Sequence, residues 1–274
     1  MKKIIALILA AMMAFMLAAC GGNGDNTTTT NADNDSVAAE SDLEYIKNKG
    51  TLVVGITDFA PMDYQEAGSS EWIGFDADMA KAFAASLGVE AEIIPIDWDN
   101  KIFELNSKTI DCVWNGMTLT DEVLAAMTCS DAYCNNAQVV IVPADKADSF
   151  KTAEDCKSLK FAVEAGSAGK NAAEDNGYEF TEVIDQATAL AEVAAGTADA
   201  AIIDSLMAGA MVGEGTSYAS LTYTVSLTTE EYGVGFRQGS DLAAALNDFF
   251  AKSKADGSME AVAETYGVQA ALIK

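Results

Sequence analysis

Histidine is absent from this sequence of 274 residues, and arginine occurs once, at Arg237. Without histidine the chain has no Ser-His-Asp triad, no histidine proton shuttle and no histidine ligand for a metal ion. Cysteine does not supply a zinc site of the usual spacing either, because no two of the five cysteines form a CxxC pair. We therefore expect no metal, no cofactor and no catalytic residue in this protein.

Four cysteines follow Cys20 in the chain. Cys112 lies inside an apolar, strand-like run and Cys156 ends a short helical turn, so both are predicted to be small buried apolar residues. Cys129 and Cys134 could pair in an oxidising compartment. Five residues of extended chain between them often hold the two Cα atoms too far apart for a disulfide, however, and the sequence leaves the pairing open.

Positive charge is scarce throughout. Lysine and arginine number 16 against 42 aspartate and glutamate residues, which gives a formal net charge of −26 at pH 7. Such a chain repels phosphate backbones and anionic lipid surfaces, so nucleic acid is excluded as a partner. Apolar residues make up 50% of the chain, which is enough to pack a core.

The first residues have the pattern of an export signal. Residues 1–3 are a basic start, and the apolar run over 4–17 is too short and wrongly flanked for a membrane span. Small residues then precede Cys20, which resembles a bacterial lipoprotein signal and implies removal of residues 1–19 and lipidation of Cys20. The alternative is an ordinary secretory signal with an incidental cysteine. We expect an exported protein, lipid-anchored to the cell membrane on its extracytoplasmic side.

Residues 20–41 are predicted to form a flexible tether between this anchor and a folded body. Small and polar residues dominate Gly21–Asp35, and almost no apolar side chain is available there to bury. The rest of the chain has the length of one large domain or of two lobes.

The body alternates strands with helices in two series, the pattern of a parallel-type sheet covered by helices. In the first series we expect strands at 51–56, 89–96 and 110–114 and helices at 75–87 and 100–105. In the second we expect strands at 159–163, 200–203 and 232–236 and helices at 152–156, 187–195, 242–254 and 259–266.

Two series of similar plan predict two lobes. We assign residues 42–139 and 232–274 to lobe 1 and residues 140–231 to lobe 2. Val139–Val142 and Thr228–Gly233 are the predicted crossings between them. The space between two such lobes is the natural place for a ligand cleft.

The segment 110–123 is the most specific sign of a binding site. Residues 110–114 predict a buried strand that Asn115-Gly116 ends, and Thr120 caps a helix with acids in its first turn. Backbone N–H groups left free at this helix entrance would suit an anionic group of a small ligand. The candidate contacts are Asn115, Gly116, Met117 and Thr118. Val123 stands where the charge partner of such an anion would be expected.

Seven short motifs, in order and at compatible spacing, resemble the bacterial extracellular solute-binding proteins of family 3, which bind polar amino acids for ABC importers. The motifs are Leu52–Gly55, Gly74–Asp78, Asp97–Asp99, Ile110–Thr120, Glu164–Gly169, Asp199–Asp204 and Glu230–Gly233. The resemblance covers the chain from about Leu43 onward. It implies an α/β, two-lobed periplasmic-binding-protein-like fold of type II. In such a fold two crossing strands join the lobes, which close around the solute by a hinge motion.

The resemblance also implies roles for matching residues. Phe59 resembles the aromatic residue that stacks on the ligand, and Trp98 resembles a second wall of the pocket, although either could be a core or rim residue. The main chain of Asn115-Gly116 and Thr118, with the Thr118 hydroxyl, resembles the contacts of the ligand's carboxylate and ammonium. Ser167, at the head of a helix in the other lobe, resembles the matching carboxylate donor. Asp204 resembles the acid that pairs with the α-ammonium, and it can cap the following helix as well.

Two positions depart from the family pattern. Val123 replaces the arginine whose bidentate fork holds the α-carboxylate, and Ala168 replaces a threonine. Arg237 cannot take over, because its place after the second crossing predicts a structural role. Lys101 and Lys170 could compensate, although we expect an exposed, solvated position for both.

A set of aromatic and acidic residues is compatible with a different class of ligand. Its members are Phe59, Trp98, Trp114, Glu164 and Asp204. Ring faces and carboxylates together suit a cation. Trp114 lies in the middle of a predicted strand, so we expect it in the core.

These features predict a monomeric extracytoplasmic receptor that binds an amino acid or a related small zwitterion and delivers it to an ABC permease. A receptor for a cationic amine or another carboxylate-poor solute is the first alternative, and a ligand sensor for a membrane signalling partner is the second. An enzyme is the least favoured reading. A lyase of this fold would need a poised acid, for which Glu164 is the one candidate.

Overall fold

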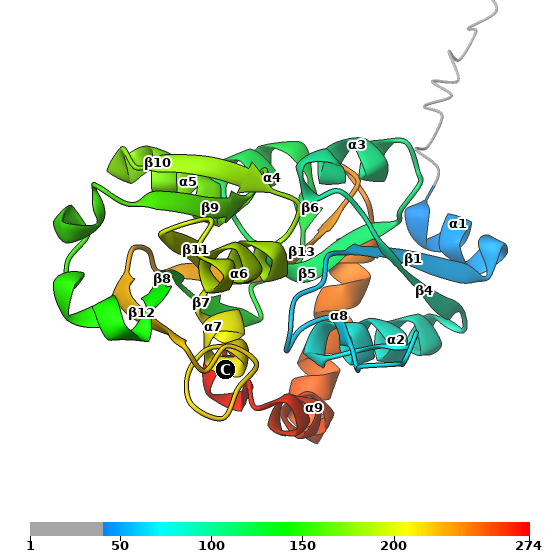
Figure 1. Cartoon of the computed structure of the whole chain (residues 1–274). Helices are drawn as coiled ribbons and strands as arrows, with labels where there is room; N and C mark the ends of the chain where they lie inside the picture. Colours follow the sequence, from blue (N-terminus) through cyan, green and yellow to red (C-terminus); the bar gives the residue numbers. More distant parts are fainter. Residues whose placement is uncertain (1–40) are drawn as a thin grey trace, which may run out of the picture. The chain divides into compact units, whose positions relative to one another are not determined.

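The computed structural model describes residues 41–274, and the predicted signal, Cys20 and nearly all of the predicted tether lie outside them. Helix α1 (Asp42–Lys49) begins at Ser41, whose side chain accepts a hydrogen bond from the Glu44 N–H and caps the helix. The chain then builds two separate main sheets, each covered by helices (Figure 1). We call each sheet with its helices a lobe.

The first lobe has a six-stranded sheet with the order β4-β1-β5-β13-β6, in which β7 also pairs with β13. Its strands are β1 (Thr51–Ile56), β4 (Glu90–Pro95), β5 (Cys112–Thr118), β6 (Thr128–Cys129), β7 (Cys134–Asn136) and β13 (Glu230–Phe236). β1 is parallel to β4 and β5, whereas β13 runs antiparallel to β5. A small hairpin accompanies this sheet, β2 (Tyr64–Gln65) with β3 (Trp72–Ile73).

The helices of the first lobe come from both ends of the described chain. They are α1, α2 (Phe75–Leu87), η1 (Trp98–Asn100), α3 (Lys101–Asn106), α4 (Asp121–Ala126), α8 (Leu242–Asp256), α9 (Ser258–Tyr266) and η4 (Gln269–Ala271). Figure 1 shows the C-terminal helices α8 and α9, orange and red, beside the blue and cyan N-terminal elements. The C-terminal segment therefore completes the lobe that the N-terminal segment begins.

The second lobe has a five-stranded sheet with the order β10-β9-β11-β8-β12. Its strands are β8 (Gln138–Pro143), β9 (Lys160–Glu164), β10 (Glu179–Val183), β11 (Ala200–Asp204) and β12 (Leu221–Ser226). Its helices are η2 (Ala144–Ser149), η3 (Glu154–Cys156), α5 (Ala168–Asn176), α6 (Gln186–Ala195) and α7 (Ser205–Met211). The two-lobed α/β fold expected from the sequence is the observed one.

The chain passes between the sheets twice, and one passage differs from the prediction. Val139–Val142 are not a crossing: they lie in β8, where they pair with β11 and β12. The run is apolar because β8 is a central strand of the second sheet, flanked on both sides. The chain enters the second lobe between β7 and β8 and returns between β12 and β13.

Large aromatic side chains fill the core of the first lobe. Trp114 is wholly buried, as expected, with its ring 6.3 Å from that of Phe83 and 5.7 Å from that of Phe250. Cys112, Cys134 and Cys156 are buried and Cys129 is half-buried. Cys129 and Cys134 are free thiols, because they lie on separate short strands that pair with different parts of β13.

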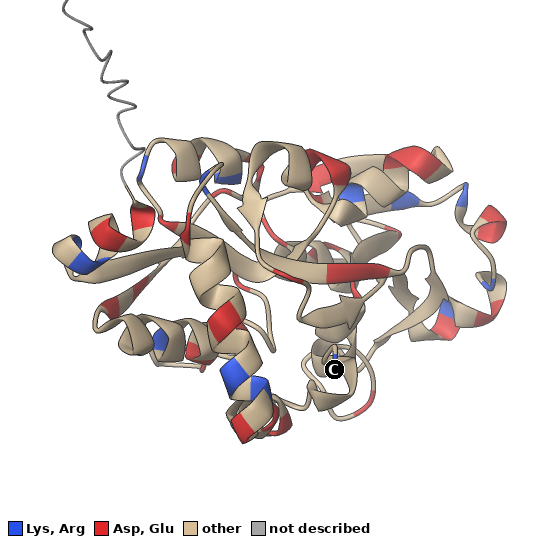
Figure 2. Ribbon diagram, turned by 180° about the vertical axis from the view of Figure 1, so that it is seen from behind, with Lys and Arg blue, Asp and Glu red and all other residues tan. Residues whose placement is uncertain are grey.

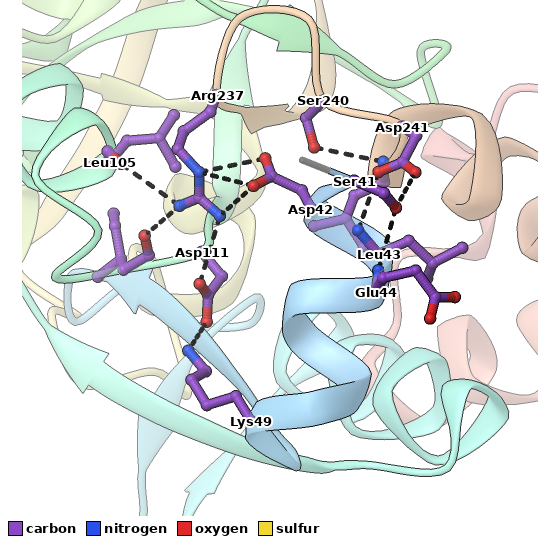
Figure 3. A network of polar contacts seen from close by, with 12 residues as sticks. Ser41, Asp42, Leu43, Glu44, Lys49, Leu105, Asp111, Arg237, Ser240 and Asp241 are labelled. Carbon is purple, nitrogen blue, oxygen red and sulfur yellow. Dashed lines mark hydrogen bonds and ion pairs between the residues drawn. The ribbon is translucent and has the colours of Figure 1, made fainter. Parts of the chain in front are cut away.

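Arg237 has the structural role that its position predicted (Figure 3). Its guanidinium forms an ion pair with Asp42 at 3.1 Å and donates to the carbonyl oxygens of Leu105 and Ile110. Asp111 lies 3.5 Å away and is paired on its other side with Lys49. The single arginine therefore ties α1 to the first sheet and is not available to a ligand.

Aspartate and glutamate residues, red on the ribbon in Figure 2, are spread over the helices, strands and loops of both lobes. No helix in residues 41–274 is both long enough and apolar enough to cross a membrane.

Candidate ligand-binding site

A pocket lies where the two lobes face each other. The residues lining it are Trp98, Lys101, Asn115, Gly116, Met117, Thr118, Thr120, Glu122, Val123, Glu164, Gly166, Ser167, Ala168, Asn171, Gln186 and Asp204. Thr118, Glu164 and Asp204 are the last residues of β5, β9 and β11, so the site lies at the carboxyl ends of strands, where open α/β sheets place their ligands. Every site residue predicted from the sequence lines it except Phe59.

The pocket is narrow. Its cavity volume is about 30 Å³.

Phe59 lies behind the pocket wall. Its side chain is 2% exposed and meets the Tyr232 ring edge-on at 6.3 Å. Gly116 lets this ring approach the backbone: a Cβ at Gly116 would lie 2.4 Å from a Phe59 ring carbon. The prediction that Phe59 stacks on the ligand has no support in this arrangement.

The predicted loop after residue 114 is a strand in the structure. β5 continues to Thr118 because β13 pairs with it, Gly233 opposite Met117 and Tyr232 opposite Thr118. The Gly116 N–H, expected to be free for an anion, donates to the Asp76 carboxylate at 2.6 Å. Burial raises the pKa of Asp76 to about 7, against the lowering effect of this N–H and of Tyr133. The Gly116 amide therefore serves the fold, not the ligand.

Thr118 is committed as a donor and free as an acceptor. Its hydroxyl donates to the Glu230 carboxylate at 2.9 Å, so its oxygen can bind a ligand only by accepting a hydrogen bond. Asn136 and Gln138, on either side of the first passage, donate to the same Glu230 oxygen at 2.6 and 2.7 Å. Glu230, which follows the second passage, thus connects the two passages between the lobes by hydrogen bonds. The sequence did not indicate this role.

Asp204 is the centre of a buried hydrogen-bond network. Its Oδ1 accepts from Tyr232 at 2.6 Å, from Gln138 at 3.1 Å and from Asn136, and its Oδ2 accepts from Gln186. Burial, and then the nearby Glu230, raise its pKa to about 7. The expected capping bond from its side chain to α7 is not formed, because these donors hold the carboxylate.

Glu164 is the second acid of the pocket wall. It is 2% exposed, and its Oε1 has no hydrogen-bond partner among the described residues. Burial, and then the nearby Asp204, raise the pKa of Glu164 to about 8. Two buried carboxyl groups therefore face the pocket from neighbouring strands of one sheet.

Ser167 stands at the head of α5, as predicted. Its hydroxyl oxygen accepts from the Lys170 N–H at 3.1 Å, which caps the helix. The N–H groups of Ala168 and Gly169 begin the first turn and have no partner within the helix. Lys170 itself does not line the pocket and pairs with Glu174 at 2.9 Å.

Lys101 is buried in the pocket wall, and the expectation of a solvated side chain was wrong. It is 8% exposed, and its ammonium donates to the Gly166 carbonyl at 2.8 Å and to the Trp98 carbonyl at 3.2 Å. The ammonium also lies 5.0 Å from the centre of the Trp98 ring. Burial lowers the pKa of Lys101. Its place one helical turn after Trp98 is the signal that could have predicted this fold-back.

Val123 lines the pocket without any charge. It is 4% exposed and packs in one apolar cluster with Trp98 and Met117. Thr120 caps α4 as expected, accepting from the Val123 N–H at 3.2 Å. Among the described residues that line the pocket, Lys101 is the one cation.

Two α/β lobes with a polar pocket between them define the class of two-lobed solute-binding proteins. The model of one family, described as bacterial extracellular solute-binding proteins, family 3, matches residues 52–269. The chain belongs to this family. It is a solute receptor, and the family is one of exported proteins.

Three known proteins illustrate the likeness. The L-cystine-binding protein TcyJ of Escherichia coli (strain K12) is 30% identical over 234 residues, which cover 84% of this chain and 88% of that protein. An ABC uptake transporter substrate binding protein from Streptococcus pneumoniae, solved with bound histidine, matches with a TM-score of 0.77 and 27% identity, covering 86% of this chain and 99% of that one. The ancestral amino acid-binding protein AncCDT-1, described as a precursor of cyclohexadienyl dehydratase, matches with a TM-score of 0.75 and 32% identity, covering 82% and 99%.

Proposed function

We propose that this receptor binds an amino acid or a related small zwitterion and serves an ABC importer. The ammonium of the solute lies against the Asp204 carboxylate and the Thr118 hydroxyl oxygen. The carboxylate lies at the first turn of α5, beside Lys101. Relatives named for binding cystine, arginine and histidine support an amino-acid solute.

The observation that carries this proposal is the position of the Lys101 ammonium. An ammonium has three N–H donors, and two of them bind the carbonyl oxygens of Gly166 and Trp98. The third is left for an anion, and Gly166 lies just before the start of α5, where the N–H groups of Ala168 and Gly169 have no partner within the helix. A lysine from the first lobe therefore supplies the charge that Val123 lacks.

A cationic amine without a carboxylate is the second candidate. Glu122, Glu164 and Asp204 face the pocket against a single lysine, and the position of Val123 holds no charge. Such a site favours a ligand with more positive than negative charge.

The remaining expectations belong to this proposal as well. Residues 1–19 are a signal that is removed, Cys20 carries a lipid, and residues 20–41 tether the monomeric body to the membrane. The first lobe (42–136 with 230–274) and the second lobe (138–226), each a few residues away from the bounds expected from the sequence, close about the passages near Gln138 and Glu230. We infer no catalytic step, because the relatives are binding proteins, even though AncCDT-1 is described as a precursor of an enzyme.

Isothermal titration of refolded, ligand-free protein with amino acids and with their decarboxylated amines tests the ligand class. Micromolar binding of amino acids, with amines at least tenfold weaker, is the expected result. Tighter binding of the amines would replace the zwitterion by the second candidate.

Mass spectrometry of the molecule that co-purifies with native protein identifies the solute directly. The lipid anchor is tested separately: release of a Cys20→Ser variant from the membrane fraction would support it.

A further inference from the structure

We propose that Glu164 is a separate cation subsite of the pocket and that the solute carries a second cationic group in addition to its α-ammonium. The solute is then a zwitterion of net positive charge, as in a dibasic amino acid. This inference rests on the proposed function, and it adds a ligand class to it.

Asp204 alone cannot hold two cationic groups. A carboxylate offers about four acceptor positions over its two oxygens. Three donors occupy Oδ1 and one occupies Oδ2, all from side chains of the protein. Since each oxygen has about two of these positions, Oδ1 is full and Oδ2 has room for one further donor. The α-ammonium takes this position.

Glu164 presents the opposite situation. It is 98% buried, it lines the pocket, and its Oε1 has no hydrogen-bond partner among residues 41–274. Buried polar atoms are nearly always hydrogen-bonded, so an unpaired oxygen in the wall of a ligand pocket points to a donor that the ligand brings.

The protein's own cation does not fill this role. Lys101 is close enough to affect the Glu164 pKa, but its ammonium is directed at the carbonyl oxygens of Trp98 and Gly166. Gln186 donates to the Asp204 carboxylate and accepts from the Asp204 N–H. Its amide also lowers the Glu164 pKa by hydrogen bonding, but Glu164 Oε1 still has no partner among the described residues. The free Glu164 oxygen is thus left to the solute.

The protonation of the site agrees with this geometry. Burial, and then the nearby Asp204 and Asp185, raise the pKa of Glu164 to about 8, while Gln186 and Lys101 act in the opposite direction and lower it. Glu164 therefore holds a proton at pH 7 while the pocket is empty. A cationic group of the solute lowers this pKa and displaces the proton to solvent, so binding releases a proton.

Pairs of probes that differ by one charge test the subsite. L-Arginine is compared with its neutral isostere L-citrulline, and L-lysine with L-norleucine, by isothermal titration at pH 7.5. At least one cationic member should bind more than tenfold tighter than its neutral partner. The Glu164→Gln variant should reduce that ratio to below threefold. Glu179→Gln, which changes an exposed acid on the neighbouring strand β10 outside the pocket, is the matched control and should keep the ratio.

Titration of the wild-type protein in two buffers of different ionisation enthalpy measures proton release without any variant. The α-ammonium of either solute displaces protons from Asp204, whose pKa is about 7, so the comparison is made within each pair. We expect a cationic solute to release between half a proton and one proton more than its neutral partner at pH 7. Equal affinity within both pairs, or a ratio unchanged by Glu164→Gln, would overturn the subsite and leave the receptor for neutral zwitterions standing. If agmatine binds tighter than arginine and Glu164→Gln weakens the binding of agmatine, the cation subsite is supported and the zwitterionic solute is contradicted. If none of these probes binds but another amino acid of the titration panel does, the subsite is contradicted and the amino-acid receptor is not.

Discussion

The ammonium of Lys101 donates a hydrogen bond of 2.8 Å to the Gly166 carbonyl oxygen, and this bond joins the two lobes at the pocket. Gly166 has a φ of +66°, and its Cα is so close to the first lobe that an added Cβ would lie 2.8 Å from the Asp99 Cα. The turn before α5 therefore packs directly against Asp99 and Lys101 of the first lobe.

Gly166→Ala should prevent this fit. The methyl group meets Asp99, and a left-handed φ costs alanine about 1–2 kcal/mol. We expect the affinity for the tightest amino acid of the titration panel to fall at least tenfold, and small-angle X-ray scattering to show a more open protein at saturating ligand. Gly177→Ala is the matched control, because Gly177 has a φ of +67° and nothing within 4 Å of the added Cβ. Equal effects of the two substitutions would show that backbone strain alone is responsible.

Lys101→Met keeps the apolar stem of the side chain and removes its charge. A hydrogen bond to a charged group contributes about 1.5–3 kcal/mol, so zwitterions should lose roughly ten- to a hundredfold in affinity. Amines without a carboxylate should lose much less. Lys170→Met, next to the same helix start but outside the pocket, should leave both affinities within threefold. Loss of amine binding equal to that of zwitterions would mean that Lys101 acts on the wall and not on the carboxylate.

Val123→Arg tests whether position 123 can again hold a carboxylate. Val123 lines the pocket, so an arginine there can present its fork to the ligand, although overpacking costs about 1–3 kcal/mol. In the Lys101→Met background we expect the substitution to restore at least tenfold of the lost amino-acid affinity, measured by titration. Val123→Leu is the control for volume without charge. If Val123→Arg raises the amino-acid affinity no more than Val123→Leu does, position 123 does not contact the carboxylate.

Three buried carboxyl groups make the ligand-free protein more stable in mild acid. Burial raises the pKa of Glu164 to about 8 and the pKa values of Asp204 and Asp76 to about 7. The folded state then binds more protons than the unfolded state between about pH 4 and pH 8, so stability falls as pH rises through this window.

Thermal unfolding at pH 5.5 and pH 8.5 checks the sign, and the midpoint should be higher at pH 5.5. Glu164→Gln removes one of the three groups and should make the midpoint less dependent on pH. Glu260→Gln, on the exposed side of α9, is the control and should leave the dependence unchanged. A midpoint that rises toward pH 8.5 would contradict the ionisation assigned to these acids.

Regular alternation in the sequence was enough to predict two α/β lobes, because core-facing strands and helices carry their own hydrophobic pattern. The ends of elements were less predictable. Asn115-Gly116 has the composition of a turn, yet β5 runs through it because β13, more than a hundred residues later, supplies a pairing edge. Val139–Val142 has the composition of a connecting strand, yet it is central to the second sheet. Both errors come from long-range pairing that local composition does not contain.

The position of a site residue was predictable where the residue lies at the end of a recognisable strand. Glu164 and Asp204 end strands and Ser167 follows Glu164 closely, so their place at the carboxyl ends of the strands could be expected. Lys101 could not be placed in the same way, since an isolated lysine is usually solvated. Its burial depends on two carbonyl groups, one of them from the other lobe.

Arg237→Met should destabilise the fold and spare the ligand. The substitution leaves Asp42 without its 3.1 Å ion pair and the buried Asp111 without a nearby guanidinium, so the free energy of unfolding should fall by about 3–5 kcal/mol in urea denaturation. Affinity measured at low temperature, where the variant is folded, should stay within threefold of wild type. Lys160→Met removes an exposed pair with Glu179 and should cost less than about 1 kcal/mol. If Arg237→Met lost affinity with little loss of stability, the single arginine would be acting on the solute, and the carboxylate contact assigned to Lys101 would have to be reassigned.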